Sequence, residues 1–182
     1  MYTKMMQDIN QKVKIPEGVT VEIADGKVKA KGPKGENERM LSHRNIKISI
    51  ENDSVIFSAM KPSKREKTMV GTFKAHVKNM MKGVNEGFTY RLKVASSHFP
   101  MTVSTDGKEL IVKNFFGEKI PRKCKIIQGV TVKIDGPTIT VESTDIEKAG
   151  KIAGLIEQTT RITNRDRRVF QDGIYITQKP SR

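Results

Sequence analysis

The sequence has no tryptophan, a single cysteine and only 5% aromatic residues. With Cys124 alone, an internal disulfide is excluded, which fits a reducing compartment. No stretch approaches the ~18 apolar residues of a membrane span, and no basic amphipathic segment with a Trp or Phe face indicates a membrane surface as partner. The chain also starts without the apolar region of a signal peptide. We therefore expect a cytoplasmic protein with no membrane partner.

Residue patterns typical of catalysis are missing as well. The three histidines lie far apart and lack a metal-ligand spacing. The sequence has no Gly-x-Ser-x-Gly, and the segment 32–35 lacks the Gly-Lys-Ser/Thr of a phosphate-binding loop. Cys124 precedes a predicted strand and is more typical of a small buried residue than of a nucleophile. We expect no enzymatic activity, no cofactor and no metal site.

Acidic residues are in deficit. The 34 Lys and Arg against 20 Asp and Glu give a formal charge of +14 on 182 residues. Residues 1–90 and residues 91–182 each carry 17 basic and 10 acidic side chains. An excess spread over both halves favours an extended basic surface over a single basic tail. Such a surface attracts phosphate backbones, with an affinity that falls as salt rises, so the expected partner is a nucleic acid.

An ordered series of elements occurs twice along the chain. In each copy a strand pair is followed by a basic loop, a second strand pair and a helix. The first pairs turn at Asp25-Gly26 and Asp106-Gly107, 81 residues apart, with the dipeptide typical of tight hairpins. The second pairs turn at Asn52-Asp53 and Asp135-Gly136. This order predicts that the chain arose by duplication.

Two helices are predicted from their start signals and apolar faces, over residues 63–82 and 144–160. Ser63–Glu66 and Thr144–Glu147 both read as capping boxes. Gly83 supplies a stop for the first helix. Gly150 and Gly154 lie on one side of the second helix, which predicts a close approach to a sheet or to RNA.

The predicted fold class is α+β, with two duplicated domains, each an antiparallel sheet with one helix packed on one face. The polar, Gly-flanked turn that begins at Gly83 marks the boundary. We therefore expect an N-terminal α+β repeat over 1–83 and a C-terminal α+β repeat over 84–182 that ends in a basic tail.

The strongest nucleic-acid signal is the tail, where four arginines fall within the eight residues 161–168. Arginine presents a planar fork of donors that suits phosphate oxygens and stacks on bases. Asp166 is expected to pair with one arginine and leave the others for phosphate, before Asp172-Gly173 turns the chain. Phe170, Ile174 and Tyr175 are expected to anchor the tail. A solvated tail without a specific partner is the alternative.

Two further segments are candidates for RNA contact. The loop 113–123 interleaves four basic residues with Phe115 and Phe116, and an exposed Phe can stack on a base. Core positions at a strand end are an equally good interpretation of both rings. The turn 96–100 offers hydroxyls and the imidazole of His98, although a plain strand connection explains it as well. The candidate residues in the three segments are Ser97, His98, Lys113, Phe115, Phe116, Lys119, Arg122, Lys123, Arg161, Arg165, Arg167, Arg168, Gln171, Tyr175 and Lys179.

Eight short segments form a recognisable set of motifs: Ile15–Val19, Gly32–Gly35, Gly71-Thr72, Asn79-Met80, Gly83-Val84, Glu86–Phe88, Ser97–Pro100 and Arg168–Tyr175. Together they resemble the L-six family of large-subunit ribosomal proteins, in its archaeal and eukaryotic branch. The resemblance covers nearly the whole chain, and its most specific part is Phe170–Tyr175. One small departure is Lys151, which stands where a Gln is common.

The resemblance implies two similar domains bound to large-subunit rRNA, with the second domain making much of the contact. It also implies a ribosomal location close to the sarcin–ricin loop, with translation GTPases docking nearby and other ribosomal proteins as neighbours. No catalysis is implied. A free-standing RNA- or DNA-binding regulator is the main alternative, and an enzyme acting on an acidic substrate is the weakest.

Overall fold

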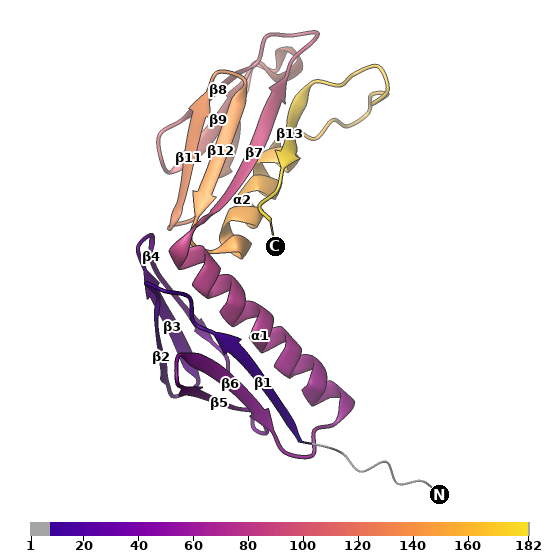
Figure 1. Ribbon diagram of the computed structural model, residues 1–182. Helices are drawn as coiled ribbons and strands as arrows, with labels where there is room; N and C mark the ends of the chain where they lie inside the picture. Colours follow the sequence, from indigo (N-terminus) through magenta and orange to yellow (C-terminus); the bar gives the residue numbers. More distant parts are fainter. Residues whose placement is uncertain (1–7, 182) are drawn as a thin grey trace, which may run out of the picture. The chain divides into compact units, whose positions relative to one another are not determined.

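The computed structural model describes residues 8–181, and these divide into two compact units between Glu86 and Gly87 (Figure 1). The start of the chain, where no signal region is predicted, lies outside the described residues. The predicted repeats 1–83 and 84–182 differ from this division by three residues. That each repeat folds separately stays a prediction. Among the described residues no helix is long and apolar enough to cross a membrane.

Unit 1 contains two three-stranded antiparallel sheets, in the orders β1-β6-β5 and β2-β3-β4. The helix α1 packs against strands of both sheets, with Phe57, Val70 and Val77 buried in the shared core. The elements are β1 (Ile9–Lys14), β2 (Thr20–Ala24), β3 (Lys27–Gly32), β4 (Gly35–Met40), β5 (Lys47–Glu51), β6 (Ser54–Ala59) and α1 (Lys64–Asn85).

Unit 2 contains a three-stranded sheet, β10-β9-β8, and a four-stranded sheet, β11-β12-β7-β13, both antiparallel. The helix α2 contributes Ile152 and Ile156 to a core that also contains Leu92 and Ile174. The elements are β7 (Phe88–Ala95), β8 (Thr102–Thr105), β9 (Glu109–Lys113), the 3-10 helix η1 (Phe115–Gly117), β10 (Arg122–Lys125), β11 (Val130–Asp135), β12 (Thr138–Ser143), α2 (Ile146–Thr159) and β13 (Gly173–Gln178).

The two units repeat one strand order. The sheet β1-β6-β5 of unit 1 corresponds to β7-β12-β11 of unit 2, and β2-β3-β4 corresponds to β8-β9-β10. The strand β13, which pairs with β7, has no counterpart in the described part of unit 1. These orders confirm the α+β class with duplicated domains. They also refine it, because each unit divides its strands between two small sheets.

All four predicted hairpins form. Asp25 and Gly26 have φ of 49° and 75°, and Asn52 and Asp53 have φ of 42° and 58°. Two successive residues with positive φ form a tight two-residue turn, and the twist of this turn matches the twist of the two strands that it joins. In unit 2, β8 pairs with β9 and β11 with β12 as predicted.

The predicted ends of the two helices are only partly correct. Ser63 caps α1 in a capping box with Glu66, as expected, but the helix continues beyond Gly83 to Asn85. The predicted capping box of α2 is wrong, because the N-cap is Asp145, whose carboxylate accepts from the backbone N–H of Glu147 at 2.9 Å. A carboxylate at the N-cap position is as good a cap as a hydroxyl.

Only one of the two glycines in α2 makes a close approach. A Cβ at Gly150 would lie 2.9 Å from Oη of Tyr90, so this part of the helix packs tightly on β7. A Cβ at Gly154 would meet no atom within 4 Å, so no sheet approaches this position closely. A close approach to RNA at Gly154 stays a prediction.

Candidate nucleic-acid interface

Three segments far apart in the sequence meet at one end of unit 2. They are the turn 96–100 after β7, the segment 114–122 around η1, and the tail loop 161–172 between α2 and β13; together we call them the loop cluster. Figure 1 shows the tail loop as a long excursion that leads into the start of β13. Hydrogen bonds join the segments: Asn114 donates to the carbonyl of Pro100 at 2.9 Å, and Arg122 donates to the carbonyl of Arg161 at 3.2 Å.

Asp172 fastens the tail loop to the turn 96–100. Its carboxylate is 2% exposed and accepts from the N–H and hydroxyl of Ser97 at 2.6 and 2.8 Å and from the N–H of His98 at 3.1 Å. Burial alone would raise the pKa of this carboxyl, but the hydrogen bonds from Ser97 and His98 outweigh burial and hold the pKa at about 2. The predicted turn at Asp172-Gly173 is wrong, because Gly173 begins β13 opposite Ala95.

Aromatic rings fill the space between the three segments. Phe116 lies edge-on to Phe115, Phe170 and Phe99, with ring centroids 4.8, 5.8 and 6.4 Å away. His98 stacks at a tilt on Phe170 at 5.1 Å. Offset and edge-on pairs of this kind stabilise their contacts beyond simple burial, so the anchoring role predicted for Phe170 is confirmed.

Arg165 lies on this aromatic group. Its guanidinium carbon is 5.1 Å from the ring centroids of both Phe116 and Phe170, within the range of cation–π attraction. The residue is nevertheless exposed. Its donors are therefore held at the surface by the rings and face solvent from a defined position.

The two phenylalanines of η1 differ in accessibility. Phe115 is 2% exposed and belongs to the core of unit 2, with the guanidinium of Arg122 over its ring at 4.3 Å. Of the two interpretations of Phe115, the structure favours the core position at a strand end. Phe116 is partly buried and borders the surface. The backbone of Phe116 is left-handed, with φ of 51°, and its ring packs edge-on to that of Phe115.

Arg122 is engaged within the protein. Its Nε and Nη2 donate to the carboxylate of Glu118 at 2.8 and 2.6 Å, and its Nη1 donates to the carbonyls of Thr159 and Arg161 at 2.9 and 3.2 Å. The hydrogen bond from Arg122 holds the pKa of Glu118 below its usual value. This arginine joins η1 to the end of α2, so the structure gives it a positioning role in the loop cluster.

The arginines at the tip of the tail loop divide as predicted. Arg168 donates to Asp166 through Nε at 3.1 Å and Nη2 at 2.8 Å, which confirms the expected ion pair. The hydrogen bonds from Arg168 lower the pKa of Asp166. Arg161 and Arg167 are exposed. In the described part of the chain, no carboxylate pairs with Arg165 or Arg167.

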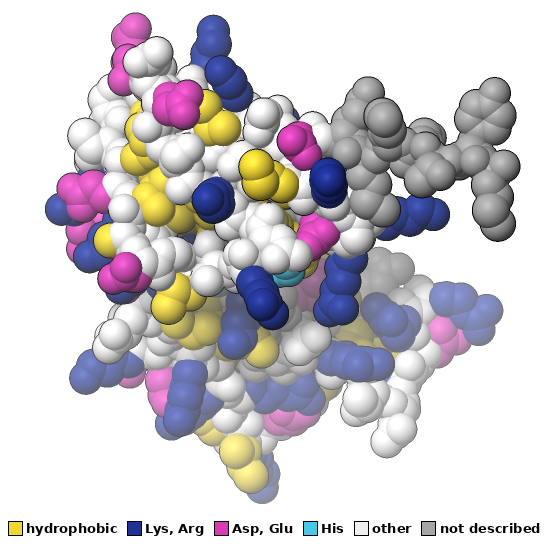
Figure 2. Space-filling view, turned by 90° about the horizontal axis from the view of Figure 1, so that it is seen from below, with side chains coloured by type: hydrophobic (Ala, Val, Ile, Leu, Met, Phe, Trp, Pro, Cys, Tyr) yellow, Lys and Arg dark blue, Asp and Glu magenta, His cyan; other side chains and the backbone are white. Residues whose placement is uncertain are grey.

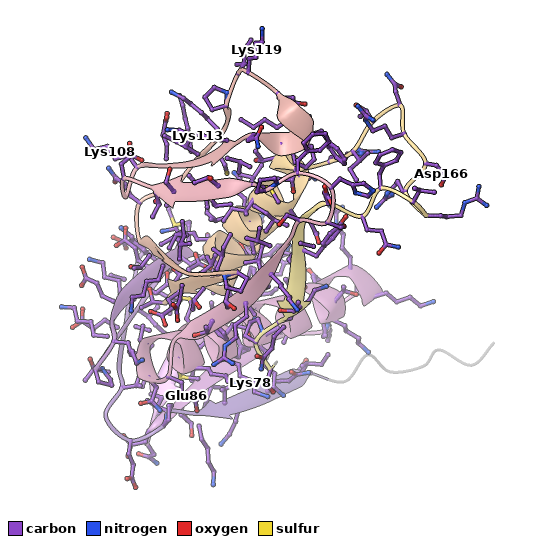
Figure 3. All side chains as sticks on the ribbon, turned by 90° about the horizontal axis from the view of Figure 1, so that it is seen from above. Lys78, Glu86, Lys108, Lys113, Lys119 and Asp166 are labelled. Carbon is purple, nitrogen blue, oxygen red and sulfur yellow. The ribbon has the colours of Figure 1, made fainter. Side chains whose placement is uncertain are left out.

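The other predicted residues lie around the loop cluster or away from it. Lys113 and Lys119 are exposed and, like Asp166, project outward in Figure 3. Gln171 donates to the carbonyl of Arg168 at 3.3 Å. Four residues lie outside the cluster: Lys113 at the end of β9, Lys123 on β10, with Nζ 3.7 Å from Glu109, Tyr175 on β13, and Lys179 just beyond β13.

Two organising residues, Asp172 and Phe99, were missed or misread in the sequence. Asp172 was interpreted only as part of a turn, and its partners lie 74 and 75 residues away, a distance at which no local pattern is visible. Phe99 was not singled out. Basic side chains are also not confined to the loop cluster, since Figure 2 shows Lys and Arg spread over the visible face among Asp and Glu.

The loop cluster gathers side chains of the kinds that bind phosphates and bases. Within residues 8–181 no group of three or more His, Cys, Asp or Glu side chains could hold a metal ion. Cys124 is buried in the core as predicted, and burial raises the pKa of its thiol. The cluster instead presents guanidinium groups, lysines and aromatic edges, which suit phosphates and unstacked bases.

Comparison with known proteins gives a consistent result. The family model described as "Ribosomal protein L6" matches residues 15–87 and 99–173, one stretch in each unit. Large ribosomal subunit protein uL6 of Archaeoglobus fulgidus is 46% identical over 173 residues, covering 92% of this chain and 88% of that protein. The proteins of the same name from Ignicoccus hospitalis and Methanococcus vannielii are 46% and 43% identical over 90% and 94% of this chain, and over 91% and 94% of their own lengths.

Proposed function

Because the chain belongs to the ribosomal protein L6 family, we propose that it is a structural component of the large ribosomal subunit that binds large-subunit rRNA. Its role is to neutralise and clamp RNA, without catalysis and without a cofactor. The loop cluster of unit 2 supplies the main contact. We assign the main RNA contact to the loop cluster because exposed arginines and aromatic rings are gathered there.

One observation carries the proposal: the tail loop is preformed. Asp172 ties it to the turn 96–100, Arg122 ties its start to η1, and Arg165 rests on two rings. A segment that is ordered before binding loses less conformational entropy when RNA arrives. The exposed Arg165 and Arg167 can then meet phosphates from fixed positions.

The charge of the chain supports the same function. Because the chain has a formal charge of +14, its binding to RNA should be dominated by phosphate contacts. Each phosphate neutralised contributes up to about −0.9 to the slope of log affinity against log salt for a duplex, and about −0.7 for a single strand. Affinity should therefore fall steeply with salt, and a complex insensitive to salt would contradict the proposal.

The bound rRNA is proposed to lie close to the sarcin–ricin loop, in the region where translation GTPases dock. Other ribosomal proteins are expected as neighbours, on cytoplasmic ribosomes. Footprinting of the rRNA in a reconstituted particle, with and without the protein, tests this location. Protection confined to sites distant from the sarcin–ricin loop would reject it.

Sedimentation separates a ribosomal component from a free-standing regulator. At moderate salt the protein should travel with large subunits through a sucrose gradient and be released at high salt. Protein that stays at the top of the gradient at moderate salt, yet binds RNA, would indicate a regulator.

Replacing Arg165, Arg167 and Arg168 with Ala tests the loop cluster directly. We expect an unchanged circular dichroism spectrum, weaker binding to large-subunit rRNA in filter assays, and a shallower salt dependence. The matched control replaces three exposed lysines of α1, Lys64, Lys67 and Lys78, with Ala, which removes the same charge. If both triple variants bind alike, the tail loop does not belong to the binding site.

A further inference from the structure

The four-stranded sheet of unit 2 has one face packed on its core and one face open to solvent. Leu92, Ile139 and Ile174 point inward and are fully buried. Because side chains alternate along a strand, their neighbours point outward. The open face carries Thr89, Arg91, Lys93, Thr131, Lys133, Asp135, Thr138, Thr140, Glu142, Tyr175 and Thr177, and its two acidic residues both lie on β11 and β12.

Charge on this open face is uneven. On the β11 side, Lys133 lies with its Nζ 3.4 Å from the carboxylate of Glu142, so positive and negative charge offset each other. On the β7 side, Arg91 and Lys93 are exposed, and no ion pair joins either side chain to another described residue. The β7–β13 half of the face is therefore the positive half.

An aromatic ring lies beside these two charges. Tyr175 stands directly opposite Lys93 in the pairing of β13 with β7 and is 37% exposed. A Cβ at Gly173 would come within 3.2 Å of Cζ and Oη of Tyr175. The ring of Tyr175 therefore lies along the strand, over the backbone of Gly173. A side chain at position 173 would displace the ring.

The open half is continuous with the loop cluster. Asp172, which fastens the tail loop, is followed directly by Gly173, the residue beneath the Tyr175 ring. In the opposite strand, β7 runs from Arg91 and Lys93 into the turn 96–100. An RNA strand on the tail loop can therefore continue over β13 and β7 without crossing an acidic residue of this half of the sheet.

We propose that the β7–β13 half of the open face binds a single-stranded segment of rRNA, with phosphates on Arg91 and Lys93 and an unstacked base on the ring of Tyr175. The inference rests on the proposed rRNA binding and extends it to residues outside the loop cluster. Stacking on an aromatic ring and neutralisation of phosphates are the two contributions that hold single strands on a protein surface.

The test uses the full chain and a transcript of large-subunit rRNA. Lys93→Gln and Lys133→Gln each remove one lysine charge from the same face, so Lys133→Gln is the matched control. We expect Lys93→Gln to weaken binding and to lower the salt slope by about 0.7, with little change for Lys133→Gln. Tyr175→Leu, which keeps an apolar side chain, should weaken binding at least about 5-fold. Urea unfolding of each variant checks that unit 2 stays folded.

A second readout places the base. An rRNA transcript containing 5-iodouridine should crosslink to the peptide that contains Tyr175 on irradiation, and Tyr175→Leu should remove that crosslink. The inference is overturned if Lys93→Gln and Lys133→Gln bind alike, or if Tyr175→Leu binds as the wild type does. When the sheet variants are neutral and the variant lacking Arg165, Arg167 and Arg168 is weakened, only this inference fails. When the wild type itself does not bind rRNA, the proposed function fails with it.

Discussion

The carboxylate of Asp172 accepts hydrogen bonds from both the backbone N–H and the hydroxyl of Ser97, which lies 75 residues earlier in the chain. Ser97 follows the end of β7, and Asp172 precedes the start of β13. The two bonds therefore fix the same end of two paired strands and close the base of the tail loop. Asp172 therefore helps to position the arginines of the tail loop, together with Arg122 and the rings beneath Arg165.

Asp172→Asn should lower the free energy of unfolding by about 2 kcal/mol at pH 7. The amide keeps one acceptor but loses the charge that the Ser97 and His98 donors stabilise. Because the folded pKa of Asp172 is depressed to about 2, its contribution is fully present above the unfolded pKa near 4 and is lost as the pH falls through about 2. Urea unfolding followed by circular dichroism at pH 7, 4 and 2 measures it.

The matched control for this prediction is Asp166→Asn. That carboxylate is exposed and paired with Arg168 at the tip of the tail loop, so its loss should change stability little. A difference between wild type and Asp172→Asn that stays constant down to pH 2 would contradict the assignment.

Arg122→Lys should destabilise unit 2 by about 1–2 kcal/mol although the charge is kept. A lysine cannot reproduce the fork that holds Glu118 and reaches the carbonyls of Thr159 and Arg161. Thermal unfolding gives the loss, and Lys123→Gln on the same strand, an exposed position, is the control with an expected effect within about 0.5 kcal/mol. Equal melting temperatures for wild type and Arg122→Lys would refute a positioning role.

The two glycines of α2 should respond in opposite directions to alanine. Gly154→Ala adds a Cβ into open space and should stabilise by up to about 1 kcal/mol, since glycine is a poor helix former. Gly150→Ala places a Cβ 2.9 Å from Oη of Tyr90 and should destabilise by about 1 kcal/mol or more through overpacking. Denaturant midpoints of the two variants measure the contrast, and a gain at both positions would show that Tyr90 moves aside freely.

Cys124 should react slowly with iodoacetamide in the folded protein. The thiol is buried and its pKa is raised by burial, so both access and the thiolate population are reduced. A cysteine introduced at the exposed Gln128 (Gln128→Cys) should react at least about tenfold faster, as peptide mapping by mass spectrometry can measure. Similar rates at the two positions would place Cys124 at the surface.

The features predicted correctly from the sequence are local ones. The hairpin at Asp25-Gly26 needs only two residues that tolerate positive φ, and the ion pair between Asp166 and Arg168 joins side chains two positions apart. The capping box at Ser63 spans four residues. Each of these features depends only on residues close together in the chain, so it can be predicted from a local sequence pattern.

The features missed depend on contacts between distant segments. Asp172-Gly173 resembles a turn locally, but hydrogen bonds from Ser97 and His98 and pairing with β7 make it the start of a strand. Phe115 and Phe116 are adjacent residues of the same type. Only the fold around η1 determines that the ring of Phe115 is buried and that the ring of Phe116 borders the surface. The role of Arg122 likewise depends on carbonyl groups 37 and 39 residues away.

The strand β13 has a consequence for the order in which the protein can be completed during synthesis. In unit 1 all strands and the helix α1 are translated before Gly87. In unit 2 the first strand, β7, lies between β12 and the last strand, β13. At about 5–20 residues per second, β7 leaves the ribosome several seconds before the strand that covers its second edge. The nascent chain must therefore carry an unpaired strand edge on β7 until β13 has emerged.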